Sequence, residues 1–199
     1  MNSKIFLAIF SLFLLINCTN SVLEEDKTIQ NIFTQDEIKD LAILMVFFEN
    51  KICEFKQTSS EEVSDCYSNY GLYWKEVIES ETTLVTPNIS YKEQLLLYKT
   101  ISSSTFDEVW EIGEGENAEI RYTNGKYLTF LEELSNDNEV VANYYESYLF
   151  METMNPGMYG SLFINHEYFD FGDVRIRLFY AIHFLTLNDY LKRNRPEIQ

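Results

Sequence analysis

Basic residues are scarce in this chain of 199 residues, which has 15 Lys and Arg against 32 Asp and Glu and a net charge of −17 at pH 7. Surfaces that bind nucleic acid carry a basic patch for the phosphates, so this charge balance argues against nucleic acid as a partner. It also disfavours direct docking on anionic lipid headgroups. A strongly acidic surface suits solubility, a bound cation or a basic protein partner.

Sequence motifs of the common catalytic and cofactor sites are absent. The chain has no Gly-x-Ser-x-Gly nucleophile elbow, no His-Glu-x-x-His zinc motif, no glycine-rich phosphate loop and no EF-hand loop. It has two histidines. His166, with Glu167 beside it and Asp170 and Asp173 downstream, has the chemistry of a metal or acid–base site, but a surface histidine is the simpler interpretation. His183 is expected in or beside the core. We therefore assign no catalytic residue, metal ligand or cofactor.

Long apolar runs are limited to one, from Ile5 to Ile16, which a single cation, Lys4, precedes. The run is too short for a transmembrane helix, which needs about 20 apolar residues to cross the bilayer. A charged start followed by an apolar stretch of this length is typical of a secretory signal peptide. We expect residues 1–17 to be such a signal.

The end of this run, Leu15-Ile16-Asn17-Cys18, resembles the lipobox of bacterial lipoproteins, with Asn17 where a small residue is usual. The resemblance covers only the signal region. It implies cleavage before Cys18, a lipid on that cysteine, and a membrane-anchored place in the bacterial cell envelope, with the outer membrane expected. The alternative is ordinary signal peptidase cleavage, which wants a pattern of small residues that only Thr19-Asn20-Ser21 approaches.

Cysteine is rare too, and its count favours lipidation. The chain has three cysteines, so a lipid on Cys18 leaves the pair Cys53 and Cys66 in an oxidising compartment. Capping boxes at 34–37 and 59–62 predict two consecutive helices, with the two cysteines almost equidistant from the break between them. We predict a disulfide across this antiparallel hairpin, worth ~3 kcal/mol. Two reduced core cysteines are the alternative.

Apolar residues at helical spacing predict a mainly α fold of six or seven helices packed as antiparallel hairpins. The residues after Cys18 up to 33 are interpreted as a polar tether, and residues 34–199 as a single helical domain. A third capping box at 90–93 begins another helix, and the last helix is expected to start near Asp173.

The middle of the chain is harder to interpret. Ser102-Ser103-Ser104 is interpreted as a break, with a short helix from the box at 105–108 through Ile112. Asn124-Gly125 lies between strand-like runs, which leaves open a small β-hairpin near 118–130 beside a helix from about 126. Residues 157–173 are expected to be irregular, with at most one helical turn.

Two groups of residues are candidates for binding a partner. The first is a stretch with six acids and no base, suited to a basic partner or loosely bound calcium: Asp107, Glu108, Glu111, Glu114, Glu116 and Glu119. A solvated loop is the alternative. The second is the tyrosine cluster Tyr144, Tyr145 and Tyr148, which could anchor a protein or stack on a sugar. Core packing is its alternative.

We expect a lipid-anchored envelope protein that binds a protein partner without catalysis, in an inhibitor-like, immunity-like or assembly role. An envelope hydrolase that uses carboxylates from different helices, and a glycan-binding lipoprotein, are the alternative functions.

Replacing Cys18 by Ser is expected to abolish lipidation, because the proposed acceptor thiol is lost. Bacteria that express the full chain would be fed an alkyne-labelled palmitate, and the purified protein would be tested for the label. We expect the label in the wild type and in Cys53→Ser, the matched control, and none in Cys18→Ser. A label that persists in Cys18→Ser would show that the lipobox interpretation is wrong.

Overall fold

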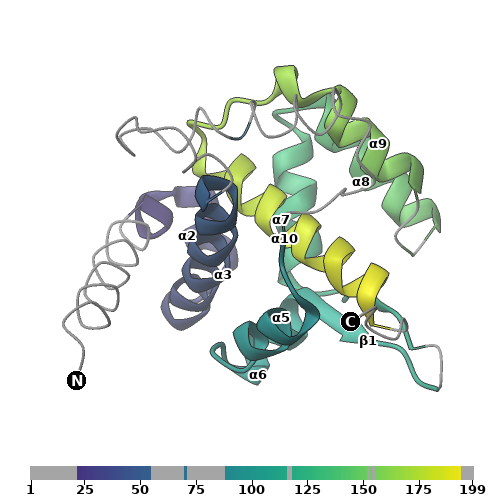
Figure 1. Cartoon of the computed structure of the whole chain (residues 1–199). Helices are drawn as coiled ribbons and strands as arrows, with labels where there is room; N and C mark the ends of the chain where they lie inside the picture. Colours follow the sequence, from purple (N-terminus) through teal and green to yellow (C-terminus); the bar gives the residue numbers. More distant parts are fainter. Residues whose placement is uncertain are drawn as a thin grey trace.

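A long helix, α10 (Val174–Lys192), runs through the middle of the molecule (Figure 1). The computed structural model describes residues 22–54, 70, 88–115, 118–151, 153 and 156–193. Every residue from 176 to 189 of α10 is buried, and a helix buried all round needs neighbours on every side. Its start is confirmed at the predicted place, because the Asp173 carboxylate accepts a hydrogen bond from the backbone N–H of Arg175.

The other elements pack around α10. In chain order they are α2 (Lys27–Ile32), α3 (Gln35–Glu54), α5 (Tyr91–Tyr98), α6 (Ser103–Val109), β1 (Trp110–Ile112), β2 (Ile120–Tyr122), α7 (Lys126–Ser135), α8 (Glu139–Met151), α9 (Pro156–Ile164) and the 3-10 turn η1 (His166–Tyr168). Figure 1 shows α3 on one side of α10 and α8 with α9 on the other. The predicted mainly α class is confirmed. Among the described residues, no helix is long and apolar enough to span a bilayer.

Two predicted capping boxes are present. At the start of α3, the Thr34 N–H donates to the Glu37 carboxylate over 2.7 Å, and the Glu37 N–H donates to the Thr34 hydroxyl over 3.4 Å. At the start of α5, Ser90 and Glu93 make the same reciprocal pair. The predicted apolar face of α3 is buried, with fully enclosed side chains at Ile38, Leu41, Met45, Phe48 and Ile52.

The predicted break at the three serines is present, since α5 ends at Tyr98, but Ser103 and Ser104 already belong to the next helix. Ser102 is the N-cap of α6, and its hydroxyl accepts the Thr105 N–H. The Asp40 carboxylate of α3 in turn accepts the N–H and hydroxyl of Ser102, at 2.9 and 2.7 Å. The predicted helix through Ile112 is therefore wrong at both ends, because α6 starts earlier and the chain turns extended at Trp110.

The small hairpin exists, but at a different place from the one that Asn124-Gly125 suggested. Strands β1 and β2 pair antiparallel, and Glu111 faces Arg121. The positive φ of 99° lies at Gly115, in the connection between these strands. Gly125 instead precedes α7, where a Cβ atom would lie 2.8 Å from the Glu108 carbonyl oxygen. Glycine is required there by close packing, not by a turn.

Residues 157–173 are more regular than predicted, because α9 fills their first half. Pro156 is the first residue of this helix, a position where proline loses no hydrogen bond and has a suitable φ.

Helices α7 and α8 form an antiparallel pair of the predicted kind. The loop between them spans 136–138, and the Asn138 side chain caps α8 by accepting the N–H groups of Val140 and Val141. Tyr127 near the start of α7 and Tyr148 near the end of α8 both pack on Tyr122, with ring centroids 4.8 and 4.9 Å apart. The predicted first hairpin and its disulfide are not tested, since Cys18, Cys66 and the Cys53 side chain lie outside the described residues.

The prediction of a polar tether up to residue 33 is wrong for the part that the structure describes. Leu23 and Ile29 are fully buried, and Phe33 packs on Phe130 of α7 with centroids 6.3 Å apart. Asp26, one of three consecutive acids at 24–26, is the N-cap of α2.

Replacing Ile29 by Ala is expected to destabilise the domain by ~2–4 kcal/mol, because it leaves a cavity in the core. Urea unfolding followed by circular dichroism measures the loss. Val22→Ala, a matched truncation of a side chain that is 36% exposed, is expected to cost far less. Equal, small losses in the free energy of unfolding for both variants would show that this segment behaves as a tether.

Candidate functional site

The predicted acidic stretch lies along α6 and the β-hairpin, and part of it has a structural role. The Glu108 carboxylate accepts the backbone N–H of Lys126 over 3.0 Å and lies 3.8 Å from its ammonium group. Glu111 pairs with Arg121 on the facing strand. Glu108 thus links α6 to the start of α7, and Glu111 links the two strands of the hairpin. Three acids remain exposed without such a role: Asp107, Glu114 and Glu119. Glu116 lies outside the described residues.

The tyrosine cluster belongs mostly to the core, as its alternative interpretation held. Tyr144 and Tyr148 are buried, while Tyr145 is half-buried. The Tyr148 hydroxyl donates to the Tyr122 carbonyl over 3.0 Å. The prediction that Tyr144 and Tyr148 present their rings to a partner is therefore wrong. Packing on α7, β2 and α10 explains them.

His183 of α10 is a buried histidine, as predicted. Its Nδ1 atom is 2.8 Å from the Tyr144 hydroxyl, which in turn is 3.0 Å from the Tyr122 hydroxyl. Burial penalises the charged imidazolium and lowers the pKa of His183 to about 3. The imidazole is therefore neutral at physiological pH. It fixes the inner face of α8 on α10.

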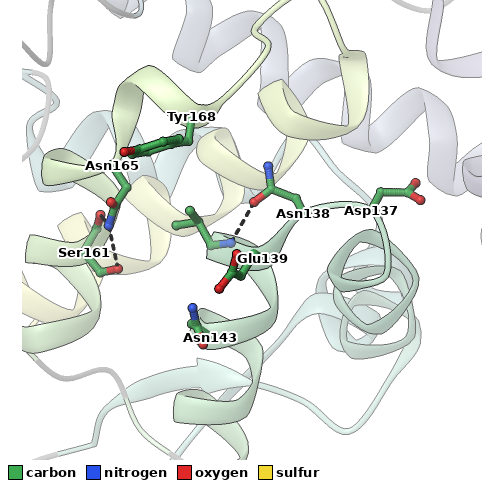
Figure 2. Close-up of a pocket in the computed structure, with 8 residues that line it drawn as sticks. Asp137, Asn138, Glu139, Asn143, Ser161, Asn165 and Tyr168 are labelled. Atoms are coloured by element: carbon green, nitrogen blue, oxygen red, sulfur yellow. Dashed lines mark hydrogen bonds between the residues drawn. The ribbon is translucent and has the colours of Figure 1, made fainter.

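The outer face of α8 borders a groove that the sequence interpretation did not find (Figure 2). Its polar end is an open hollow of about 500 Å³ between α8 and the segment made of α9 and η1. The lining residues are Asp137, Asn138, Glu139, Val140, Asn143, Ser161, Asn165 and Tyr168. Figure 2 shows Tyr168, Asn165 and Ser161 on one side and Asn138, Glu139 and Asn143 on the other.

A second hollow of about 340 Å³ continues the groove along α8. It shares Asn143 and Ser161 with the first, and its apolar lining comes from Phe150, Met151 and Met158. We call the two hollows together the α8–α9 groove. It has a polar end near the start of α8 and an apolar end near the end of that helix.

Three exposed apolar side chains line this groove: Phe150, which is 86% exposed, Tyr168, which is 72% exposed, and Met151. Leu149 and Ile164 are also exposed, on α8 and α9. The other large exposed apolar residues in the described part of the chain are dispersed over the remaining elements: Val22, Leu95, Leu96 and Ile112. Apolar clusters of this kind on a soluble protein mark interaction surfaces.

The same region is the most one-sided in charge. Residues 127–174, which include α8, α9 and η1, contain nine acids and no Lys or Arg. This run of 48 residues is longer than the acidic stretch at 107–119 and was readable from the sequence. A local cluster of acids does not mark this run, because its distinguishing property is the lack of Lys and Arg.

The polar groups of the groove differ in how far they are already engaged. Asn138 caps α8, and Asn165 donates to the Ser161 carbonyl over 2.8 Å. Asp137 accepts from Arg175 over 2.7 Å. Among the described residues, the side chains of Glu139, Asn143 and Tyr168 make no hydrogen bond, which leaves them free for a ligand.

Two carboxylates lie on one rim of the groove, Glu139 and Asp137, and Asp137 is engaged in an ion pair with Arg175. The described residues contain no group of three or more His, Cys, Asp or Glu side chains that could hold a metal ion. The proposed set of His166 with Asp170 and Asp173 is not assembled, and Asp173 instead caps α10. The arrangement is suited to binding.

No protein-family model, curated protein or solved structure matches this chain. The geometry of the α8–α9 groove and the net negative charge of the chain are the observations that bear on function.

Acid is expected to destabilise the protein through His183. The pKa of His183 is about 3 in the folded protein and 6.5 in the unfolded chain. Above pH 6.5 the imidazole is neutral in both states, so it costs no stability. As the pH falls from 6.5 towards 3, the unfolded chain takes up the proton first, and the free energy of unfolding decreases. Between pH 7.5 and pH 4.5 the loss is roughly 2–3 kcal/mol.

Urea unfolding at both pH values measures this loss, and His183→Asn isolates it from the carboxylates. The variant should lose roughly 2–3 kcal/mol less than the wild type over this interval. His166→Gln is the matched control and should follow the wild type. Parallel pH profiles for the wild type and His183→Asn would contradict a buried neutral imidazole.

Proposed function

We propose that this chain is a lipid-anchored lipoprotein of the bacterial cell envelope that binds a basic protein partner, without catalysis, in the α8–α9 groove. One observation carries the proposal: the groove is lined by exposed apolar side chains and by two carboxylates, Asp137 and Glu139, and it lies in a stretch of the sequence that has nine acids and no Lys or Arg. An inhibitor or immunity protein against a cationic target is the concrete version that fits best.

The apolar end of the groove supplies the anchoring surface. Phe150 and Met151 project from the last turn of α8 beside a hollow that Met158 also lines. Aromatic and methionine side chains are enriched in protein interfaces, and a few buried anchors carry most of the binding free energy. Phe150 has the exposed area and the adjacent hollow that an anchor of this kind needs.

Charge selects the class of partner. Two copies of a chain with a net charge of −17 repel each other, which disfavours self-association through the groove. A basic protein is attracted and steered towards the acidic region at a rate that falls with salt. The α6–hairpin acids are a weaker candidate, because Glu108 and Glu111 have internal partners and Ile112 is the large apolar residue exposed beside them.

The proposed lipid constrains where the groove faces. Leu23 is buried in the core and lies five residues after Cys18, so an extended chain holds the domain within roughly 18 Å of the anchor. Arg175 bridges Asp26 to Asp137 and places the polar end of the groove on the same side as residue 26. The apolar end lies ~16 Å further along α8, at 1.5 Å per residue.

Replacing Phe150 by Ser is expected to weaken partner binding by at least tenfold, because it removes the most exposed apolar side chain of the groove. The mature chain without lipid, residues 19–199, would be immobilised and exposed to detergent-solubilised cell envelope from the source bacterium. Captured proteins would be quantified by mass spectrometry at 50 mM and 500 mM NaCl.

Leu96→Ser, which removes an exposed apolar side chain from α5, is the matched control. Support consists of a basic protein that is captured by the wild type and by Leu96→Ser, is lost with Phe150→Ser, and is released by salt. Equal capture by all three baits would remove the groove from the proposal. Capture of no basic protein would favour the glycan or hydrolase alternatives.

A further inference from the structure

We infer that the polar end of the α8–α9 groove is an arginine subsite, in which Glu139 pairs with a guanidinium group of the partner and the Tyr168 ring stacks on it. The inference rests on the proposed function, because the arginine belongs to the segment that fills the groove. It adds the chemistry that this end recognises, and the spacing between that group and the apolar anchor.

Glu139 is a carboxylate without a side-chain partner among the described residues, at the first residue of α8, where an acid is also favourable for the helix dipole. It is exposed, lines the polar end, and makes no hydrogen bond or ion pair among the described residues. Helix capping does not require it, because the Asn138 side chain already accepts the N–H groups of Val140 and Val141. A carboxylate can accept two parallel N–H bonds from one guanidinium group, which is the strongest form of this contact.

Tyr168 provides a flat surface across the groove from this carboxylate. Figure 2 shows its ring on the opposite side of the groove from Glu139. The ring is 72% exposed and stacks on no other aromatic ring among the described residues. Guanidinium groups stack on aromatic faces, where the ring quadrupole attracts the cation. A planar guanidinium suits this pair better than the compact ammonium of lysine.

In the part of the chain that the structure describes, no basic residue lines this place. The nearest candidate, Arg175, is held by the carboxylates of Asp137 and Asp173, each at 2.7 Å, and lies 3.9 Å from Asp26. This arrangement neutralises Asp137 internally and leaves the charge of Glu139 uncompensated.

The spacing along α8 sets the register of the partner. Glu139, Asn143 and Phe150 line the groove. The eleven-residue step from 139 to 150 makes just over three helical turns, which places Glu139 and Phe150 on one face ~16 Å apart. A partner helix that lies along this face would carry an arginine and a large apolar residue eleven positions apart.

The test uses alanine-based helical peptides with Phe eleven residues after a variable position that holds Arg, Lys or Gln. Binding of each labelled peptide to the mature chain would be measured by fluorescence anisotropy at 100 mM NaCl. We expect the Arg peptide to bind about tenfold more tightly than the Gln peptide, with the Lys peptide between them.

Glu139→Gln and Tyr168→Leu should each remove most of the preference for Arg over Gln and leave the affinity for the Gln peptide unchanged. Glu119→Gln, which removes an exposed acid from the hairpin, is the matched control and should keep the preference. A wild type with no preference, or a preference that survives both groove variants, would overturn the arginine subsite. Displacement of the Arg peptide by a soluble envelope glycan, with the Gln peptide retained, would also overturn it and reassign this end to sugar.

Phe150→Ser separates this inference from the proposed function. If Phe150→Ser weakens all three peptides while Glu139→Gln has no effect on any of them, the groove still binds partners and only the arginine subsite is wrong. If Phe150→Ser leaves every affinity unchanged, the proposed docking surface is wrong, whatever the charge variants do.

Discussion

The burial of α10 on all sides is the constraint on which the rest of the structure depends. A helix in this position must carry apolar residues around its whole circumference, and any polar residue on it needs a partner from a neighbouring element. The polar residues of α10 meet this need in three directions. Thr186 accepts the indole N–H of Trp110 over 2.7 Å, His183 meets Tyr144 of α8, and Asn188 donates to Gln94 of α5. Each contact places one outer element.

These contacts explain why α8 can serve as a binding surface. Its inner face is fixed by Tyr144 and Tyr148, which reach α10 and β2. The outer face makes no comparable contribution to the core, and its side chains are free to vary in chemistry without loss of the fold. Exposed Phe150 at the end of this face has no role in packing. A rigid helix that carries unpaired side chains is a pre-organised surface, which lowers the entropic cost of binding.

Local signals in the sequence predicted the helices whose ends are determined by their own residues. The boxes at Thr34 and Ser90, the cap at Asp173 and the apolar face of α3 depend on side chains three or four residues apart, and all four were found. The error at Trp110 concerns a long-range contact. Trp110 becomes extended because it packs under α10 and pairs with Tyr122, twelve residues away.

The groove shows the same limit. Its residues come from the start of α8, from α9 and from η1, and no local pattern joins Glu139 to Tyr168. Exposure could not be read either, since Tyr144 and Phe150 are both aromatic residues of one helix and only the packing makes the first buried and the second exposed. The sequence does show that residues 127–174 include no Lys or Arg. Charge depletion over a long segment survives folding as a surface property, whereas short clusters such as 107–119 can be neutralised by distant partners.

Several of the few cations form ion pairs inside the fold. Lys126 of α7 pairs with Glu37 of α3, and Arg177 of α10 pairs with Glu49 of α3, so these two join helices. Arg175 and Arg193 pair with Asp173 and Asp189, at the start and the end of α10 itself. Arg177 is almost fully buried, and a buried cation must be paired. Each of these pairs uses one base and one acid, so the excess of acids in the chain, 32 against 15 bases, remains on the other residues. The internal ion pairs therefore fix parts of the fold without reducing the negative field that would attract a basic partner.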